Sequence, residues 1–480
     1  MGKRDRDVRH KKACVIGAGP NGLSAAIVLA QAGLRVDVFE AEAQPGGGAR
    51  TMDLTLPGFH HDFGSAVHPM AAGSPFFNSL PLADYGLEWI DSPAPLAHPF
   101  DDGTAITLER NLKDAEQVLQ EDGRAWRNLM APLSKNWHAF AKDVLQPLLR
   151  FPSHPFLLAK FAQDALAPAT FVARRRFRSE RTRALFAGLA AHSFLSLNEP
   201  LSASFGLVLG AAAHAVGWPI PRGGAQAITD ALSAHLVRLG GKIIPSTRVE
   251  GLDHVRKYDV VLCDITPQQL LHLSQGKLSP GYRKRMEEFR YGPGVFKVDY
   301  ALSSPIPWKS ADCLRAATVH LGGSMAEIAA SEAAMADGKI AERPFVLLVQ
   351  PTLFDLSRAP AGKHIAWAYC HVPNGSTFNM LPRIEAQIER FAPGFRDCVL
   401  ARRASSPADL QSMDANLVGG DISGGASDFR QFLFRPTWRQ YATSDERIYL
   451  CSSSTPPGGG VHGMCGFNAA KFALHRLSKH

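Results

Sequence analysis

Three glycines near the N-terminus have a spacing that can bind a phosphate. Gly17, Gly19 and Gly22 form the pattern G-x-G-x-x-G directly after a short apolar segment, and they open a run of small and apolar residues typical of a helix. In such a turn the first glycine permits a sharp change of direction, the second lets the backbone approach a diphosphate, and the third lets the helix pack closely on the strand. Pro20 and Asn21 complete the turn at the start of the helix, where N–H groups favour an anion. We therefore assign all five residues to the binding of a dinucleotide.

An acidic residue ends the segment that follows this helix. Residues 34–39 are mostly apolar with interspersed polar side chains, as in a strand, and Glu40 comes next, roughly 20 residues after the last glycine. A carboxylate at this position can accept hydrogen bonds from the hydroxyl groups of a ribose. The same charge disfavours a 2′-phosphate, so the strand–helix–strand unit predicts FAD or NAD in preference to NADP.

A glycine triplet and an arginine follow the acid in the segment Q-P-G-G-G-A-R-T, residues 44–51. This segment resembles the FAD-binding amine oxidase and phytoene desaturase superfamily, whose second strand ends in an acid followed by P-G-G-x-x-R-T or a close variant. The resemblance implies that the glycines let the loop pass beside the FAD diphosphate and that the arginine lies by the phosphates or the flavin. On this basis Gly46, Gly47 and Arg50 are assigned to FAD. A flexible surface turn is the alternative.

Two later segments are similar to the same superfamily. Residues 221–241 predict a helix opened by P-R-G-G and closed by two glycines, and residues 242–249 predict a strand. In the superfamily a valine of this strand flanks the adenine, which implies an adenine contact for Val249. The segment P-G-G-G-V-H-G-M-C-G-F-N-A-A, residues 457–470, resembles the C-terminal motif in which a glycine loop and a helix approach the flavin. That resemblance assigns to FAD the residues Gly459, Gly460, Val461 and His462.

Lys297 is the predicted catalytic residue. Its segment, G-P-G-V-F-K at residues 292–297, resembles the amine oxidase segment in which a lysine holds a water against flavin N5. A cation or a bound water at that place can stabilise charge on a reduced flavin and steer its reaction with oxygen. The alternative is that Lys297 begins a solvent-facing strand edge.

No metal site and no covalent attachment of the flavin are predicted. His60, His61 and His68 lie close together in the sequence, but no carboxylate at ligand spacing accompanies them. The seven cysteines form no C-x-x-C pair, and their odd number and mostly apolar neighbours predict buried free thiols in a reducing compartment. Because no second catalytic apparatus is evident, the chemistry is expected to depend on the flavin.

Length and composition predict a globular protein of two domains. The chain has 480 residues, of which 45% are hydrophobic and 20% charged, and its formal net charge is +8. It exceeds the size at which a single hydrophobic core usually stops growing. Basic residues are scattered apart from one cluster and no nucleic-acid motif accompanies them, so nucleic acid is not an expected partner. No run of about 18 apolar residues is present, and we expect a cytoplasmic protein that does not span a membrane.

The residue patterns divide the chain into a discontinuous nucleotide-binding domain and an inserted domain. Residues 12–110, 215–290 and 444–480 are assigned to the FAD-binding domain, because they hold the nucleotide motifs. Residues 111–214 have a helical pattern and residues 291–443 begin with alternating strand signals, and both are assigned to a substrate domain. The predicted fold class is α/β, with a Rossmann-like FAD-binding domain and an inserted α+β substrate domain.

One part of the helical region is both apolar and basic. Residues 145–177 are rich in Leu, Phe and Ala between basic residues, and the cluster R-R-R-F-R occupies residues 174–178. A basic helix face beside an apolar face can lie on an anionic membrane surface, which would make this a peripheral membrane protein. The alternative is a solvated helix end next to a substrate cavity lined by apolar helices.

Together the motifs predict an FAD-dependent oxidoreductase related to phytoene desaturases. The expected reaction transfers a hydride between the flavin and a hydrophobic substrate, with a polyene or lipid-like molecule as a candidate. A flavin amine oxidase is one alternative, and a non-catalytic binding protein stabilised by FAD is another, since fold alone does not choose between them. The sequence does not indicate the substrate, the direction of reaction, the electron acceptor or the oligomeric state.

Overall fold

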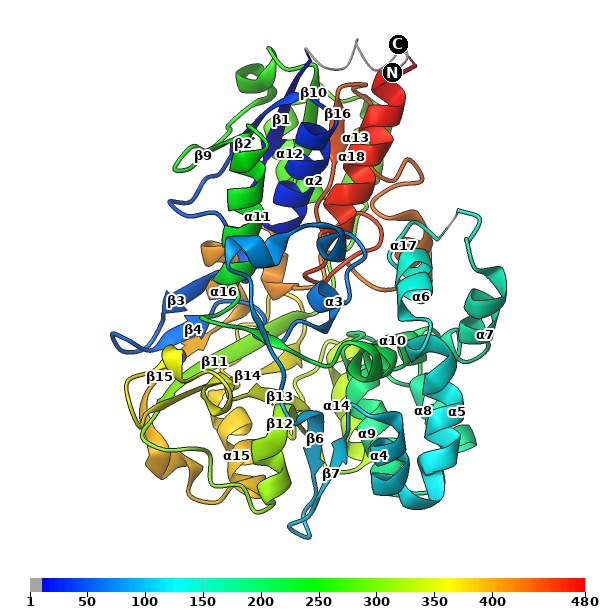
Figure 1. The fold of residues 1–480 in the computed structure, drawn as a ribbon, viewed down its shortest axis with the longest axis vertical. Coiled ribbons are helices and arrows are strands. Elements are labelled where there is room, and N and C mark those ends of the chain that lie inside the picture. Colours follow the sequence, from blue (N-terminus) through cyan, green and yellow to red (C-terminus); the bar gives the residue numbers. More distant parts are fainter. Residues whose placement is uncertain (1–10, 149, 480) are drawn as a thin grey trace.

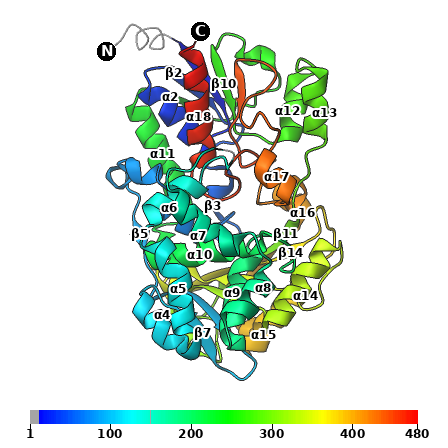
Figure 2. The ribbon, with the colours of Figure 1, turned by 90° about the vertical axis from the view of Figure 1, so that its right-hand side faces the viewer.

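The computed structural model describes residues 11–148 and 150–479, and two large sheets lie one above the other along its long axis (Figure 1). A five-stranded sheet carries the first described strand and the last helix. A seven-stranded sheet occupies the other half, and a layer of helices stands beside it (Figure 2). The predicted α/β fold with a Rossmann-like domain is confirmed.

Neighbouring strands of the five-stranded sheet are all parallel, in the order β16-β10-β1-β2-β9. The strands are β1 (Lys12–Ile16), β2 (Arg35–Phe39), β9 (Lys242–Ile244), β10 (Val260–Cys263) and β16 (Ile448–Leu450). Parallel neighbours need a crossover connection, which helix α2 (Pro20–Gln31) supplies between β1 and β2. The strands come from three separate segments of the chain, so residues distant in sequence meet at the carboxyl edge of this sheet.

Close packing of helices covers this sheet. Helices α11 (Gln226–Arg238) and α18 (Met464–Leu477) lie beside α2 (Figure 1). A Cβ atom at Gly466 of α18 would lie 1.8 Å from the carbonyl oxygen of Asn21, so α18 touches the first turn of α2 through backbone atoms. The C-terminal helix is thereby held against the glycine-rich turn.

The strand predicted for residues 242–249 is shorter than expected. β9 ends at Ile244, because Pro245 has no N–H for a strand ladder and Ser246 has a φ of +51°, which turns the chain. Val249 therefore lies in an irregular segment after the strand. This segment is attached to β2 nonetheless, since the N–H of Thr247 donates to the carbonyl oxygen of Glu40 over 2.7 Å.

The seven-stranded sheet has the order β15-β11-β14-β13-β12-β6-β7, and only β6 and β12 pair in parallel. Its strands are β6 (Ala94–Pro99), β7 (Ala105–Leu108), β11 (Gly294–Leu302), β12 (Ala316–Leu321), β13 (Val346–Val349), β14 (His364–Val372) and β15 (Val399–Ser405). The predicted boundaries grouped residues 94–108 with the nucleotide-binding part. The structure places them in this sheet instead, because β6 pairs with β12 over its buried length.

The two faces of this sheet have different surroundings, because successive side chains of a strand point to opposite faces. On β11, Phe296, Val298 and Tyr300 point to a core that includes helix α15 (Leu381–Phe391). Val295 lies on the opposite face, in a core shared with the helical layer. Lys297 is two residues after Val295 on the same strand, so its side chain points to the same face as that of Val295.

The remaining elements are mostly helices. The helical layer consists of α4 (Leu112–Val118), α5 (Gly123–Ser134), α6 (Trp137–Val144), α7 (Pro155–Ala165), α8 (Ala169–Arg176), α9 (Glu180–Ala191) and α10 (Ser202–Ala215). Other helices are α3 (Pro69–Ala72), α12 (Pro267–Ser274), α13 (Pro280–Glu287), α14 (Met325–Ala336), α16 (Pro407–Met413) and α17 (Phe429–Phe434). Two small sheets pair β3 (Thr51–Asp53) with β4 (His60–Asp62), and β5 (Trp89–Ile90) with β8 (Ile220–Pro221).

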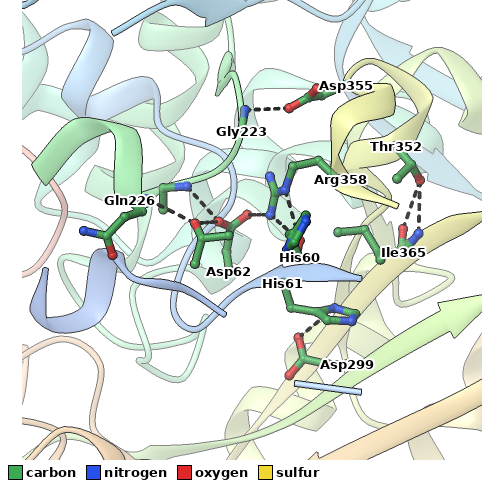
Figure 3. Close-up of polar contacts among 12 residues, drawn as sticks. His60, His61, Asp62, Gly223, Gln226, Asp299, Thr352, Asp355, Arg358 and Ile365 are labelled. Atoms are coloured by element: carbon green, nitrogen blue, oxygen red, sulfur yellow. Dashed lines mark hydrogen bonds and ion pairs between the residues drawn. The ribbon is translucent and has the colours of Figure 1, made fainter. Parts of the chain in front are cut away.

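A buried ion pair joins the two halves of the molecule (Figure 3). Nη2 of Arg358 lies 2.8 Å from Oδ2 of Asp62, and neither side chain is exposed to solvent. Arg358 also donates to the carbonyl oxygen of His60, whereas Oδ1 of Asp62 accepts from the Thr51 hydroxyl and from the N–H of Ala225 before α11. Burial acts to raise the pKa of Asp62, but the Arg358 guanidinium and the Ala225 N–H outweigh burial and lower it.

We predict that Arg358→Met lowers the free energy of unfolding by about 3–5 kcal/mol, because it leaves the Asp62 carboxylate buried without a countercharge. The matched control is Arg222→Met, which breaks an ion pair with Glu88 whose side chains are 52% and 58% exposed. The control should cost at most about 1 kcal/mol. Urea unfolding of both variants measures the difference, and equal losses would refute the role assigned to the buried pair.

Candidate active site

One cavity of about 1350 Å³ extends from the five-stranded sheet to the seven-stranded sheet. Its walls include Glu40 and Val249 at the first sheet and Lys297 and Tyr369 at the second. Pockets for a single small ligand usually have volumes of roughly 300–1,000 Å³. The cavity therefore has room for a dinucleotide and a second molecule.

The turn between β1 and α2 forms one end of this cavity. Gly17 has a φ of +97°, which is strained for residues with a side chain, and its N–H donates to the carbonyl oxygen of Phe39 over 2.8 Å. Backbone N–H groups at the start of α2 are suited to bind an anion. The predicted residues of this turn that line the cavity are Gly17, Gly19, Pro20 and Asn21.

Gly22, by contrast, is a packing residue. A Cβ atom there would lie 2.0 Å from the carbonyl oxygen of Gly17, so only glycine lets α2 come so close to the turn. Its N–H donates to Oδ2 of Asp264 over 2.8 Å. The structure thus gives Gly22 an indirect part in forming the turn, and it does not line the cavity.

The Glu40 carboxylate lies against the same turn. Oε2 accepts from the N–H of Ala18 over 2.7 Å, and Oε1 accepts from the N–H of Glu42 over 2.9 Å. The side chain is buried and faces the cavity. The predicted acid is therefore located beside the predicted phosphate turn, where it can meet a ribose.

Two carboxyl groups near this turn, of the buried Asp264 and the half-buried Asp414, were missed by sequence reasoning. Asp264 follows β10 and Asp414 follows α16, and both line the cavity. Burial raises the pKa of Asp264 to about 8, with Asp414 and Glu40 adding to the rise and the Gly22 N–H opposing it. Burial also raises the pKa of Asp414. The signal for Asp264 was present, since it follows an apolar segment, residues 260–263, as Glu40 follows residues 34–39.

The second glycine segment lies directly beside the first. The N–H of Gly46 donates to the carbonyl oxygen of Ala18 over 3.0 Å, and a Cβ atom at Gly47 would lie 3.2 Å from Cα of Gly19. Gly47 lines the cavity, whereas Gly46 does not. The two segments that the superfamily resemblance assigned to one cofactor are thus in contact.

Arg50 holds this segment in place and also faces the cavity. Its Nε donates to the carbonyl oxygen of Gly47 over 2.9 Å, and its Nη2 donates to that of Met413 over 2.5 Å. The guanidinium lies 5.1 Å from the centroid of the Phe63 ring. Arg50 is therefore ordered by three neighbours and presents a fixed positive charge.

The C-terminal glycine loop closes the cavity on another side. All four of its predicted residues line the cavity: Gly459, Gly460, Val461 and His462. Nδ1 of His462 accepts from the N–H of Met464, the first residue of α18. Burial lowers the pKa of His462 to about 4, so the imidazole is neutral near pH 7.

Arg435 is a further cavity residue that sequence reasoning left unassigned. It is buried, and its Nε and Nη2 have no hydrogen-bond partner among the described residues. A Cβ atom at Gly458 would lie 2.4 Å from Nη1, so the guanidinium is pressed against the C-terminal loop. Unpaired donors of a buried cation are costly, and an anionic or oxygen-rich ligand in the cavity would satisfy them.

Lys297 lies inside the sheet, and the alternative of a solvent-facing strand edge is wrong. β11 runs between β14 and β15, and Lys297 is only 5% exposed. Its Nζ donates to Oδ1 of Asp299 over 2.5 Å and to the carbonyl oxygen of Asp62 over 3.0 Å. The ammonium also lies 5.7 Å from the centroid of the Trp367 ring. A cation thus faces the cavity from the middle of the second sheet.

His60 and His61 have hydrogen-bond partners, whereas the ring nitrogens of His68, which lines the cavity, have none among the described residues. His60 is exposed and pairs with Asp53, whereas His61 and His68 are buried, which lowers the pKa of His61 to about 3 and that of His68 to about 4. No group of three His, Cys, Asp or Glu side chains suited to a metal ion occurs in the described part of the chain. All seven cysteines are free thiols, and six are buried, as predicted.

Helix α7 forms both a cavity wall and a protein surface. Leu158, Phe161 and Ala162 line the cavity, while Phe156 of the same helix is 91% exposed and the preceding Phe151 is 85% exposed. Within residues 11–148 and 150–479 no single helix is both long and apolar enough to cross a membrane; α7 and α8 pass that test only as a pair, bent by 96°.

Known proteins resemble this chain over almost its whole length. The family description NAD(P)-binding Rossmann-like domain matches residues 15–80. Pyridine nucleotide-disulfide oxidoreductase domain-containing protein 2 of Mus musculus is 26% identical and covers 97% of this chain and 93% of its own. Phytoene desaturase (lycopene-forming) of Pantoea ananas is 24% identical, with coverages of 97% and 99%.

A solved structure shares the fold. Wild-type putrescine oxidase bound to putrescine has a TM-score of 0.60 and 13% sequence identity, and the similarity covers 98% of this chain and 99% of that chain. At this identity the similarity concerns the fold alone. The expected relationship to oxidoreductases of the phytoene desaturase type is confirmed by the two sequence relatives, and putrescine oxidase confirms the fold.

Proposed function

Since this chain belongs to the superfamily of oxidoreductases that includes phytoene desaturases and amine oxidases, we propose that it binds FAD noncovalently and acts on a hydrophobic substrate. Bound FAD supplies hydride transfer to or from a C–C unit of the substrate. The observation that carries the proposal is the continuity of one cavity from the dinucleotide turn to Lys297. A nucleotide site and a reaction site therefore share one space.

The residues at the nucleotide end fit FAD. The amides at the start of α2 can bind the diphosphate, Glu40 can accept from the ribose hydroxyls, and Val249 can contact the adenine. The contact between the first and second glycine segments favours FAD over NAD, because a domain that binds only NAD has no need of the second. The unpaired donors of Arg435 give a further place for an electron-rich group of the cofactor.

The other half of the cavity fits an apolar substrate. Its walls include Leu158, Phe161, Leu209 and Trp218 from the helical side, and Leu347 from the sheet. These side chains exclude water from the region beside Lys297 and its ion-pair partner Asp299, which strengthens the electrostatic interactions of that pair. The role of the protein there is to orient the substrate and to hold a cation near the reacting atoms.

A specific feature bears on the amine oxidase alternative. Trp367 and Tyr369 lie on the cavity floor with their rings stacked on each other at a centroid distance of 5.4 Å. Rings stacked in this way leave no gap for an amine between them, so this pair does not form an aromatic cage. The other alternative is a non-catalytic protein that only binds FAD. In such a protein no reductant would bleach the flavin absorbance.

We predict that the purified protein is yellow and releases its FAD on acid denaturation. Glu40→Ala should weaken FAD about ten- to a hundredfold, because a charged hydrogen-bond partner contributes roughly 1.5–3 kcal/mol. The control Glu287→Ala removes an exposed acid from α13 and should bind FAD as the parent does. Titration of the cofactor-free proteins with FAD measures the affinities. A parent that takes up no FAD, or flavin that stays with the precipitate, would contradict the proposal.

For Lys297 we predict that Lys297→Met keeps its FAD but changes the rate of flavin reduction or reoxidation at least about tenfold, which corresponds to roughly 1.4 kcal/mol of barrier. The control is Lys363→Met, an exposed lysine outside the cavity. Stopped-flow absorbance of both half-reactions is the measurement. Superimposable traces for the Lys297 variant and the parent would exclude a catalytic role for this side chain.

We further propose that α7 and its flanking residues contact an anionic membrane surface. Phe151 and Phe156 are almost fully exposed, and the basic residues Arg150, Lys160 and Arg174 are exposed around them. Apolar side chains inserted among headgroups, with cations beside them, are typical of peripheral binding. Because α7 also forms a cavity wall, a lipid-soluble substrate could enter directly from the bilayer.

This surface predicts that the protein sediments with vesicles of phosphatidylcholine and phosphatidylglycerol, and less with phosphatidylcholine alone. The double variant Phe151→Ser/Phe156→Ser should lose most of this binding, since it removes the two most exposed apolar side chains of the region. Leu356→Ser is the control, because Leu356 is 79% exposed on another part of the surface. Equal sedimentation of both variants would exclude this membrane contact.

A further inference from the structure

A row of four side chains crosses one face of the second sheet, and three of them, Lys297, Tyr369 and Leu347, line the cavity. Lys297 on β11 is opposite Tyr369 on β14, Tyr369 is opposite Leu347 on β13, and Leu347 is opposite His320 on β12. Paired residues of neighbouring antiparallel strands lie on the same face. Three strand spacings of about 4.8 Å separate the ends of the row, so His320 lies roughly 14 Å from Lys297.

A second histidine meets the far end of this row. His192 follows helix α9, and its Nε2 lies 3.1 Å from Nε2 of His320. Gly188 of α9 leaves room for this contact, because a Cβ atom there would lie 2.6 Å from Nδ1 of His320. Trp218 packs against both imidazoles, with centroid distances of 5.9 and 6.2 Å. His192 lines the cavity, whereas His320 is fully buried behind it.

The loop that carries His192 is held rigidly. Phe194 has a φ of +59°, a conformation that costs a bulky residue free energy, and its ring lies 4.1 Å from the ring of His371. His371 is in turn fixed by a buried hydrogen bond of 2.7 Å between its Nδ1 and Oε2 of Glu332. The contact of His192 with His320 and that of Phe194 with His371 thus hold this loop in place.

The protons of the histidine pair can be assigned from its surroundings. Burial lowers the pKa of His192 to about 3 and that of His320 well below its usual value, so both rings are neutral. A bond between two Nε2 atoms then needs one donor and one acceptor. Nδ1 of His320 is buried without a partner among the described residues, and a buried orphan N–H is rarer than a buried orphan acceptor. His320 therefore donates from Nε2, and His192 carries its proton on Nδ1.

From this arrangement we propose that His192 binds a neutral oxygen atom, a carbonyl or a hydroxyl, at the end of an apolar substrate far from the reacting bond. The proposal rests on the proposed function, which places the reacting bond near Lys297. A neutral N–H donor among Trp218, Phe194 and Leu347 suits an uncharged acceptor, because a carboxylate would lose its hydration in an apolar setting without gaining a countercharge. The substrate class is thus a long apolar molecule with an oxygen function roughly 14 Å from the site of reaction.

The test compares two probes of equal length, 2-dodecanone and dodecane, added to the FAD-loaded protein. Binding is measured by the change in tryptophan fluorescence, to which Trp218 and Trp367 in the cavity wall contribute. This measurement does not depend on turnover. The parent should bind the ketone about three- to tenfold more tightly than the alkane, as expected for one added neutral hydrogen bond. His192→Leu should bind the two probes equally and keep the alkane affinity of the parent.

Further variants separate this binding role from a structural one. The double variant His192→Phe/His320→Leu removes both polar partners, so that no buried N–H is orphaned if the single variant folds poorly. His192→Asn retains a donor and should recover part of the ketone preference. The control His254→Leu changes an exposed histidine outside the cavity and should keep the full preference.

Two results would overturn the inference: equal binding of ketone and alkane by the parent, or an unchanged preference in both His192→Leu and the double variant. Either result can occur while FAD is bound and reduced normally, which leaves the proposed function intact. Conversely, a flavin that no substrate reduces would reject the proposed function, while the fluorescence preference would still report on His192.

Discussion

The Asp62 carboxylate is the contact on which the arrangement of both halves depends. It is fully buried, so its charge must be paired and hydrogen-bonded to be tolerated. Arg358 supplies the countercharge, the N–H of Ala225 fixes the start of α11, and the carbonyl oxygen of the same Asp62 accepts from Lys297. Asp62 therefore connects β4 to Arg358, to the start of helix α11 and to Lys297 on the second sheet. The cavity between the sheets has a defined shape because these three connections leave little freedom.

Charges are distributed unevenly along the cavity. Glu40, Asp264 and Asp414 gather at the nucleotide end, where a diphosphate would add further negative charge. Burial raises the pKa of Asp264 to about 8, so this group holds a proton at neutral pH and does not repel a phosphate. The cations Arg50 and Arg435 face the same space, and Arg435 has donors that no described residue satisfies. This end of the cavity is thus prepared for an anion in spite of its three acids.

The opposite end depends on the two-residue period of the second sheet. One face of β11 packs into an apolar core, while the other presents Lys297 to the cavity. Because the register between four strands is fixed, Lys297 and His320 are the two ends of one row of paired residues, with Lys297 facing the cavity and His320 buried behind it. Helices α7 and α10 then supply apolar walls, and His192, which follows α9, is the partner of His320. Under the proposed function, the reaction site would lie at one end of this row of paired residues and the oxygen-binding histidine at the other.

The sequence alone determined those features that depend on short-range geometry. Glycine spacing at Gly17, Gly19 and Gly22 predicted the turn, because each glycine acts within a few residues of its own position. Alternation and helical periodicity predicted the elements around the glycine motifs and the helical character of residues 111–214, whereas the strand predicted for residues 242–249 ended early at Pro245 and Ser246. The superfamily resemblance assigned Gly47, Arg50 and the loop at Gly459 to one cofactor, and the structure brings them to one cavity without testing that assignment.

Only the tertiary structure decided which distant residues meet. It moved residues 94–108 into the second sheet, because β6 finds its partner in β12 more than 200 residues later. It showed that Lys297 is buried between two strands, which no local pattern separates from an edge position. It also added Asp264, Arg435 and the contact between His192 and His320. Strand register and helix packing create such contacts, and a linear sequence carries no direct record of either.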